Sequence, residues 1–479
     1  RKKKVMKNSG KSRFSVNHGG GLLNKRNSLK LQKFKENNSK RKVLITTIIL
    51  STLLLSGIYL YNSFALFTEE KHFNVINGEI QDPGDIYFAY YVDDNITREM
   101  PKKGTGYTLD IEKSNCTNGV VPTWDNGGWK FIGDFSGYNA TDYTRTRCNL
   151  YFKKINMTAV EYIKDLTLYD NKTLVTDEAG GNIRYIGSNP NNYVNIDGDI
   201  WRIIGVMKNI DDGTGNKSDR VKLIRAESIG SYSWDTSDSS VNSGHGVNEW
   251  SQADLMKLLN PGYESEVVGG SLYWNSKSGN CYNNANNSTT SCNFTSIGIR
   301  DKLKALIGNA IWNTGANDAK AYTHENISTQ KFYEFERSTN TGKICTSGIY
   351  CNDSVTRTTT WKGKVGLMYV SDYGYATSGG STTGRTTCLN KELYSWSGYS
   401  DCYVNNWLFN STSWQWTLSI PEFFYDAYRE FIISSSGYVN ASSDDFLSNA
   451  VFPAVYLLSS VKIVSGDGSK VNPYYLSEK

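Results

Sequence analysis

An uncharged apolar run, "VLITTIILSTLLLSGIYLY" at Val43–Tyr61, limits how this chain can fold more than any other feature. Its 19 residues match the roughly 20 that a helix needs to cross the bilayer core. Arg41 and Lys42 precede it, and Tyr59 and Tyr61 stand where an interfacial aromatic belt would lie. The pattern therefore predicts a transmembrane helix. A cleaved signal peptide and a buried core helix are the alternatives, but a signal peptide has a shorter basic region and an apolar run of roughly 7–15 residues.

The distribution of charge gives this helix an orientation. Residues 1–42 hold 15 Lys and Arg and a single acid, Glu36. The other residues hold the remaining 37 of the chain's 52 basic residues and 46 of its 47 acidic residues, a net charge of −9. Because positive charge stays on the cytoplasmic side, we expect a single-pass cell-membrane protein with a cytoplasmic N-terminus and extracellular C-terminal domains. A protein that binds nucleic acid carries its basic residues on the folded domain, so no nucleic-acid partner is expected.

All eight cysteines follow the apolar run, on the side predicted to be oxidising. No C-x-x-C pair occurs, so zinc-ribbon spacing is absent. The cysteines fall in couples that are close in sequence, which favours disulfides between nearest neighbours, although free buried thiols are an alternative. The predicted bridges are Cys116–Cys148, Cys281–Cys292, Cys345–Cys351 and Cys388–Cys402.

Composition shifts along the chain divide it into five parts. The run "DIYFAYYVDD", dense in β-branched and aromatic residues, and the alternating run "RTRCNLYFKK" predict a small β-sandwich. The stretch "TAVEYIKDLTLYD" predicts a helix after it. The predicted parts are a basic cytoplasmic tail (1–42), a transmembrane helix (43–61), a small β-sandwich module (72–154), a helical linker (155–173) and a large β-rich domain (174–476).

The large domain opens with "NYVNIDGDIWRIIGVM", which predicts a hairpin because Asp197-Gly198 suits a tight turn. The pattern "WSQADLMKLLNPG" predicts a helix capped by Ser251 with Asp254 as its partner. A second helix is expected in "IRDKLKALIGNAIWNTG" and a third in "STQKFYEFERS". With strands on either side of these few helices, the predicted fold class is α+β.

Four segments carry a resemblance to known proteins: "NIRYIGSNPNNYVNIDGDIWRIIGVM", "VNEWSQADLMKLLNPGYES", "KVGLMYVSDYGYAT" and "VYLLSSVKIVSGDGSKVNPYYL". They resemble uncharacterised, membrane-anchored surface proteins of gut Firmicutes, in which a small Cys-paired module precedes a larger domain. That domain is similar to C-type-lectin-like folds, as used by formylglycine-generating enzymes. The resemblance implies a C-type-lectin-like domain in which the first and last strands pair and long loops form the ligand face. It implies no activity.

The chemistry of those families finds little support in these residues. The large domain contains no "EPN", "QPD" or "WND" calcium motif, and "NIDDGTGNKSD" lacks calcium-loop spacing. The surroundings of Cys345 and Cys351 do not match an oxidase site. His245 and His324 stand in polar loops without a nucleophile elbow. We therefore expect no catalytic residue, no metal, no cofactor and no enzyme activity.

The strongest functional signal is the aromatic stretch "LYSWSGYSDCYVNNWLFNSTSWQW". Its Tyr and Trp among Ser, Gly and Asn are typical of recognition loops. At least half of these rings are expected to be buried, with Trp414 and Trp416 foremost. The predicted ligand-binding residues are Trp396, Tyr399, Tyr403 and Trp407.

These patterns favour a membrane-anchored extracellular recognition or adhesion protein that binds a glycan or protein ligand through aromatic loops. A structural or assembly component of the cell envelope is the alternative, and a surface enzyme is the third hypothesis.

Overall fold

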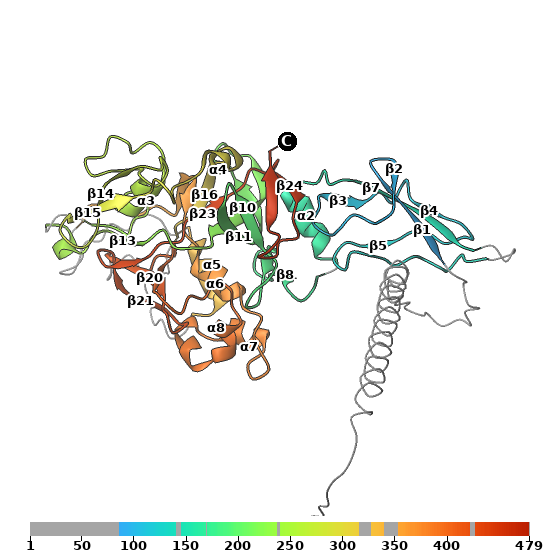
Figure 1. Ribbon diagram of the computed structural model, residues 1–479. Coiled ribbons are helices and arrows are strands. Elements are labelled where there is room, and N and C mark those ends of the chain that lie inside the picture. The colour runs from blue at the N-terminus through green and yellow to red at the C-terminus, as the bar shows by residue number, and fades with distance from the viewer. Residues whose placement is uncertain are drawn as a thin grey trace, which may run out of the picture. The chain divides into compact units, whose positions relative to one another are not determined.

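The computed structural model in Figure 1 describes residues 86–139, 145–168, 170–236, 240–315, 327–339, 353–421 and 427–478, with only the backbone at 442–444. The predicted tail (1–42), the apolar segment (43–61) and the predicted Cys345–Cys351 bridge lie outside these residues. Two apolar cores occur among the described residues: one within 86–154, which we call the N-terminal module, and one that extends from residue 159 to 476.

The predicted fold class needs correction. The structure is β-rich, with 34% strand and 15% helix. No helix among the described residues is both long enough and apolar enough to cross a bilayer. The predicted transmembrane helix is therefore not supported. The two or three helices expected in the large domain are too few. The described part of that domain holds six short α-helices, none longer than eight residues.

The N-terminal module is built on one five-stranded sheet in the order β2-β1-β7-β3, with β4 also paired to β7. Its central strands β1 and β7 run parallel, a pairing that requires a long crossover and that no local pattern predicts. A separate β5–β6 hairpin places Trp124 in the core with Leu150 and Phe152. The module is thus a sheet with a hairpin and not a sandwich of two comparable sheets. Its strands are β1 (Tyr87–Val92), β2 (Asn95–Thr97), β3 (Tyr107–Leu109), β4 (Asn115–Cys116), β5 (Trp124–Asp125), β6 (Lys130–Phe131) and β7 (Arg147–Lys154).

The linker forms the predicted helix, α2 (Ala159–Leu166). Thr158 accepts a hydrogen bond from the backbone N–H of Glu161, and the Glu161 carboxylate accepts one from the backbone N–H of Thr158. This capping box fixes where the helix begins. The apolar face carries Ile163 into the large core.

A nine-stranded sheet forms the centre of the large domain, in the order β18-β23-β12-β11-β10-β25-β24, with β9 paired to β11 and β8 to β9. The predicted hairpin is confirmed, because Ile196 pairs with Asp199 and both turn residues adopt positive φ. The last strand, β25, runs parallel to β10. The strands are β8 (Leu174–Thr176), β9 (Ile183–Tyr185), β10 (Tyr193–Ile196), β11 (Asp199–Asp211), β12 (Lys217–Arg225), β18 (Val365–Gly366), β23 (Ala454–Tyr456), β24 (Lys462–Ser465) and β25 (Tyr474–Ser477).

Smaller sheets complete the strands of this domain. The five-stranded one has the order β13-β22-β19-β20-β21, and two hairpins pair β14 with β15 and β16 with β17. Their bounds are β13 (Ser231–Ser233), β14 (Ser278–Tyr282), β15 (Thr289–Asn293), β16 (Ala310–Asn313), β17 (Thr360–Gly363), β19 (Gln415–Trp416), β20 (Arg429–Ile433), β21 (Val439–Asp444) and β22 (Ser448–Ala450).

The helices of the large domain depart from the predicted lengths. The first begins at Asp254, and Ser251 does not cap it. The second ends at Leu306, and the "AIWN" that follows is strand β16. The third forms in the expected segment, and Ser328 caps it. The helices are α3 (Asp254–Leu259), α4 (Asp301–Leu306), α5 (Thr329–Glu336), α6 (Val370–Tyr375), α7 (Arg385–Asn390) and α8 (Ser400–Val404), with 3-10 turns η1 (Asn242–Gly244) and η3 (Leu393–Gly398).

Three predicted disulfides are present in the structure. Cys116–Cys148, Cys281–Cys292 and Cys388–Cys402 have Cα separations of 4.0, 6.0 and 5.5 Å. The first joins neighbouring strands β4 and β7, and the second joins the two strands of the β14–β15 hairpin. The third holds α7 to α8 and organises the aromatic stretch.

Candidate functional site

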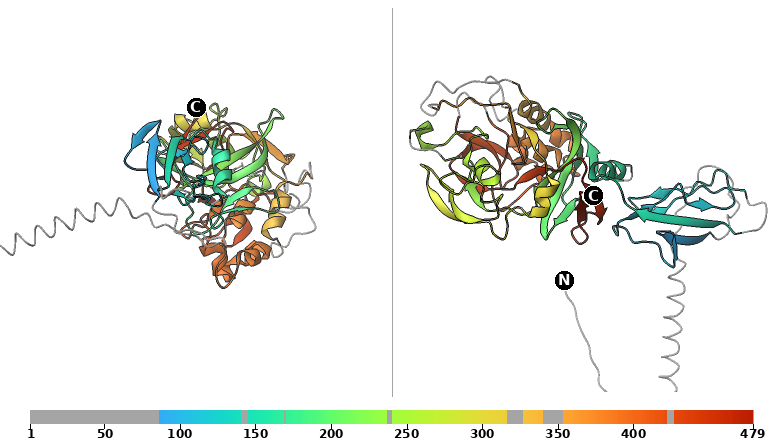
Figure 2. Two further views of the ribbon diagram at one scale, coloured as in Figure 1. Left: turned by 90° about the vertical axis from the view of Figure 1, so that its right-hand side faces the viewer. Right: turned by 90° about the horizontal axis from the view of Figure 1, so that it is seen from above.

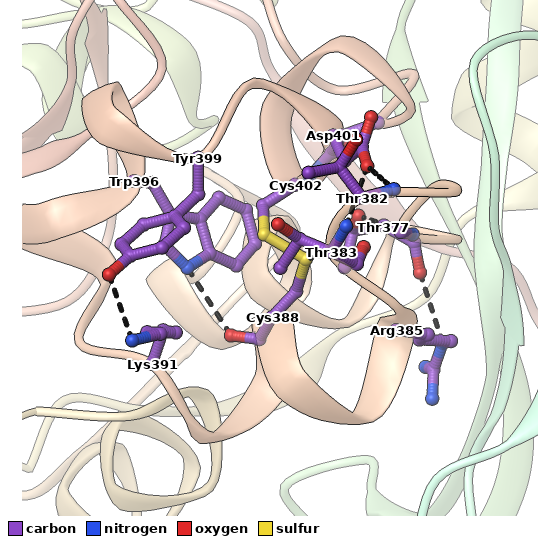
Figure 3. Close-up of a disulfide and its surroundings, with 12 residues drawn as sticks. Thr377, Thr382, Thr383, Arg385, Cys388, Lys391, Trp396, Tyr399, Asp401 and Cys402 are labelled. Atoms are coloured by element: carbon purple, nitrogen blue, oxygen red, sulfur yellow. Dashed lines mark hydrogen bonds between the residues drawn. A yellow bond between two sulfur atoms is a disulfide. The ribbon is translucent and has the colours of Figure 1, made fainter.

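The aromatic stretch begins with the short helical segments η3 and α8, and Cys388–Cys402 ties α8 to the preceding helix α7. In Figure 1 and in the left view of Figure 2 the orange segment that contains them lies at one end of the large domain. The Asp401 carboxylate accepts hydrogen bonds of 2.7 Å from the backbone N–H groups of Thr382 and Thr383 (Figure 3). This contact fastens the preceding loop to α8, so the stretch is a fixed platform.

Trp396 and Trp407 do not form the predicted ligand surface. The Trp396 side chain is 0% exposed and packs 5.3 Å from the Tyr373 ring. Its indole N–H donates to the Cys388 carbonyl, as Figure 3 shows. Trp407 is 8% exposed, and its N–H donates to the Tyr185 carbonyl at 2.8 Å. A tryptophan that finds a carbonyl for its N–H buries its large ring at little polar cost, so these two residues are core.

The two tryptophans expected in the core behave differently from each other. Trp416 is 1% exposed, which confirms the expectation, and its N–H donates to the Tyr232 carbonyl. Trp414 is 41% exposed, which contradicts it. Trp414 precedes strand β19, which begins at Gln415, so the exposed ring lies outside the strand and the buried one lies within it.

Tyr399 and Tyr403 remain half-buried and partly reachable by a ligand. The Lys391 ammonium donates to the Tyr399 hydroxyl at 2.9 Å (Figure 3). The Tyr403 ring meets the Phe409 ring edge-on at 5.0 Å. It also covers Gly437, where an added Cβ would come within 2.3 Å of the ring. Because Gly437 has a φ of +84°, the turn between β20 and β21 needs glycine there for both backbone and space.

Two further tyrosines extend this surface. Tyr394, 41% exposed, meets Tyr438 with ring centres 5.8 Å apart. Tyr438 is the residue after Gly437, which the Tyr403 ring covers. We call Tyr394, Tyr403, Phe409 and Tyr438 the aromatic patch. Tyr394 was within the predicted stretch, but Tyr438 lies in "SSSGYVN", whose Ser/Gly/Tyr composition was the available signal.

A buried ionic network lies in the core of the same domain. The Arg184 guanidinium donates to Asp177 at 2.8 Å and also to Asp372, and the Lys222 ammonium donates to Asp372 at 2.6 Å. Burial lowers the pKa of Lys222 to about 8, although Asp372 opposes the shift. Burial alone would raise the pKa of Asp372, but Lys222 and Arg184 hold it well below its usual value. Two cations and two anions compensate one another, so the network joins β9, β12 and α6 without surplus charge.

A small surface cavity lies beside α3, near two acids whose pKa values are raised, Asp235 and Asp254. Ser233, Asp254, Lys257, Glu266 and Tyr282 are among the residues that line it. Behind it, Asp235 accepts hydrogen bonds from the backbone N–H groups of Val247 and Asp254. Burial, and then the Asp254 carboxylate, raise the pKa of Asp235 to about 7.

The acids at this cavity have structural partners. Asp235 satisfies the first N–H of α3, which has no side-chain cap of its own. Asp254 in turn accepts hydrogen bonds from the backbone and hydroxyl of Thr236. The pair therefore fastens the helix to the preceding loop.

No group of His, Cys, Asp or Glu in the described part of the chain could hold a metal ion. Comparisons with known proteins found no match to a protein-family model, to a curated protein or to a solved structure. The resemblance to Firmicutes surface proteins therefore stays a prediction.

Proposed function

We propose that this chain is a recognition protein that works outside the cytoplasm and binds a glycan or protein ligand through the aromatic patch. The observation that carries the proposal is the edge contact between Tyr394, which is 41% exposed beside the Cys388–Cys402 disulfide, and the half-buried Tyr438. Tyrosine supplies a large amphipathic surface with little loss of conformational entropy. The three disulfides favour an oxidising compartment.

The fixed platform reduces the conformational entropy that is lost when a ligand binds. Tyr403 is held against Gly437 and Phe409, and Asp401 fixes the loop beside α8. A ligand that docks on rings already held in place loses less side-chain freedom than one that must order them. The proposal assigns no catalytic step to the patch.

The test is a glycan-array and cell-binding screen with the full chain and two variants, Tyr394→Ser and Tyr438→Ser. Each variant should weaken binding by about 2 kcal/mol, the typical loss when an aromatic anchor is truncated. Trp414→Ser removes an equally exposed ring outside the patch and should bind as the wild type does. Unchanged binding by both tyrosine variants would exclude the patch.

A second candidate function, a structural component of the cell envelope, is favoured by the burial of Trp396 and Trp407. In that case the aromatic stretch would serve packing alone. The same screen separates the two functions, because a structural component would show no saturable binding of the full chain to any glycan or cell surface.

A further inference from the structure

Arg202 is a buried cation without an acidic partner among the described residues. Its side chain is 9% exposed, on strand β11. Burial lowers its pKa, and the only opposing contribution comes from Tyr193 and not from a carboxylate. The other buried cations discussed above, Arg184 and Lys222, each meet a carboxylate. Since burying an uncompensated charge is costly, this arginine calls for an explanation.

The guanidinium is held in place by neutral groups. Tyr193, its cross-strand neighbour on β10, lies on it with the ring centre at 4.2 Å, and the Trp407 ring centre lies at 4.5 Å. Both rings are themselves fixed, because the Tyr193 hydroxyl bonds to Asn189 and the Trp407 N–H bonds to Tyr185. Rings at these distances stabilise the cation through their quadrupoles. They do not neutralise it.

Hydrogen bonds set the direction in which the guanidinium points. Its Nε donates to the Asn192 side chain at 2.8 Å, and Asn192, fully buried, is anchored in turn on the Ile203 carbonyl. Nη2 makes only long contacts, 3.4 Å to the Pro190 carbonyl and 3.5 Å to Asn189. Nη1 donates to no described protein acceptor, and it is not among the polar atoms sealed from solvent. The Nη2 side of the fork thus lies near Asn189, which is exposed.

We propose that Arg202, between Tyr193 and Trp407, binds a singly charged oxyanion group, a carboxylate or a sulfate ester, on a small ligand. The guanidinium fork matches the oxygens of such a group, and the partial exclusion of water strengthens the ion pair. Burial lowers the pKa of Arg202 to about 10, so the cation persists at neutral pH. One cation in otherwise neutral surroundings compensates one negative charge, which disfavours a phosphate monoester of about −1.5 to −2.

The proposal does not rest on the aromatic patch. The experiment is calorimetric titration of the full chain with three probes that share a sugar ring: methyl glucuronide, a sulfate ester of methyl glucoside, and methyl glucoside itself. At least one acidic probe should bind saturably at millimolar concentration, and added salt should weaken that binding. The neutral glucoside should not bind. Comparison of the two acidic probes decides between carboxylate and sulfate ester.

Variants connect the binding to the guanidinium. Arg202→Gln should lower the affinity for the acidic probe by about tenfold or more, because it removes the charged donor. Arg202→Lys keeps the charge without the fork, so its affinity for the acidic probe should lie between those of the wild type and Arg202→Gln. Arg300→Gln removes an arginine that pairs with Asp199 elsewhere and should leave the affinity unchanged.

Two results would overturn the proposal: equal affinity of wild type for all three probes, or wild-type affinity in Arg202→Gln. The first of these needs no variant, so it decides the matter even if Arg202→Gln does not fold. Because none of these measurements involves Tyr394 or Tyr438, failure here leaves the proposed recognition surface standing, and the reverse is also true.

Discussion

At the residue scale, three tryptophans of the aromatic stretch are buried with the indole N–H bonded to a backbone carbonyl. They are Trp396, Trp407 and Trp416, whereas Trp414, just before strand β19, is 41% exposed. The sequence predicted the aromatic stretch itself, because its composition is local. It could not tell which rings face inward, since the carbonyl that accepts from Trp407 belongs to Tyr185, far away in the chain.

Truncation should separate these two kinds of tryptophan. Trp396→Ala removes a fully buried ring and should lower the free energy of unfolding by about 3–5 kcal/mol. Trp414→Ala alters an exposed site and should change it by about 0.5 kcal/mol or less. Denaturant unfolding of both variants beside the wild type measures the difference. Equal stability of the two variants would mean that Trp396 is not core.

At the scale of elements, local patterns predicted the Asp197-Gly198 hairpin and the helices α2 and α5, whose stabilising contacts are local. The Asp197-Gly198 hairpin, the capping box of α2 and the Ser328 cap of α5 all use neighbours in sequence. Helix α3 shows the opposite case, because its first N–H is satisfied by Asp235, 19 residues earlier. The Ser251 cap was therefore a wrong prediction. The parallel pairings β1–β7 and β10–β25 were likewise outside any local pattern.

The contact of Asp235 with α3 should make stability depend on pH. Its pKa in the folded chain, about 7, lies above the ordinary value of about 3.9, so the folded state holds the proton more tightly. That contribution is fully present below about pH 4 and is lost as the pH rises through about 7. Asp235→Asn has no proton to lose there, so its free energy of unfolding should fall less than that of the wild type between these pH values.

Urea unfolding at a series of pH values measures this difference in slope. Asp212→Asn is the control of opposite sign, because hydrogen bonds from Thr214 lower the pKa of Asp212. Asp212→Asn should change how the free energy of unfolding depends on pH only below about pH 4. At higher pH its slope should equal that of the wild type. A wild-type slope in Asp235→Asn would show that Asp235 does not titrate as described.

At the scale of the whole molecule, the sequence predicted the cysteine pairs better than the sheets. Pairs close in the chain need little knowledge of the fold, and three of them form in the structure. The nine-stranded sheet instead joins strands from β8 to β25, and hydrophobic alternation alone does not specify which strands become neighbours. The aromatic patch depends on such distant pairing, since Tyr438 reaches Tyr394 through the turn between β20 and β21.

The proposed compartment yields a prediction for the intact protein in its cell. Disulfides persist where the surroundings are oxidising, so all of the described cysteines should be paired when the protein is isolated under acid quench and mapped without reduction. The bridge between Cys345 and Cys351 should appear in the same peptide map. Protease added to intact cells should also digest residues 86–478, while a cytoplasmic marker protein stays whole. Cysteines found as thiols, together with protection from protease until the cells are lysed, would place these residues in the cytoplasm and remove the basis for recognition at the cell surface.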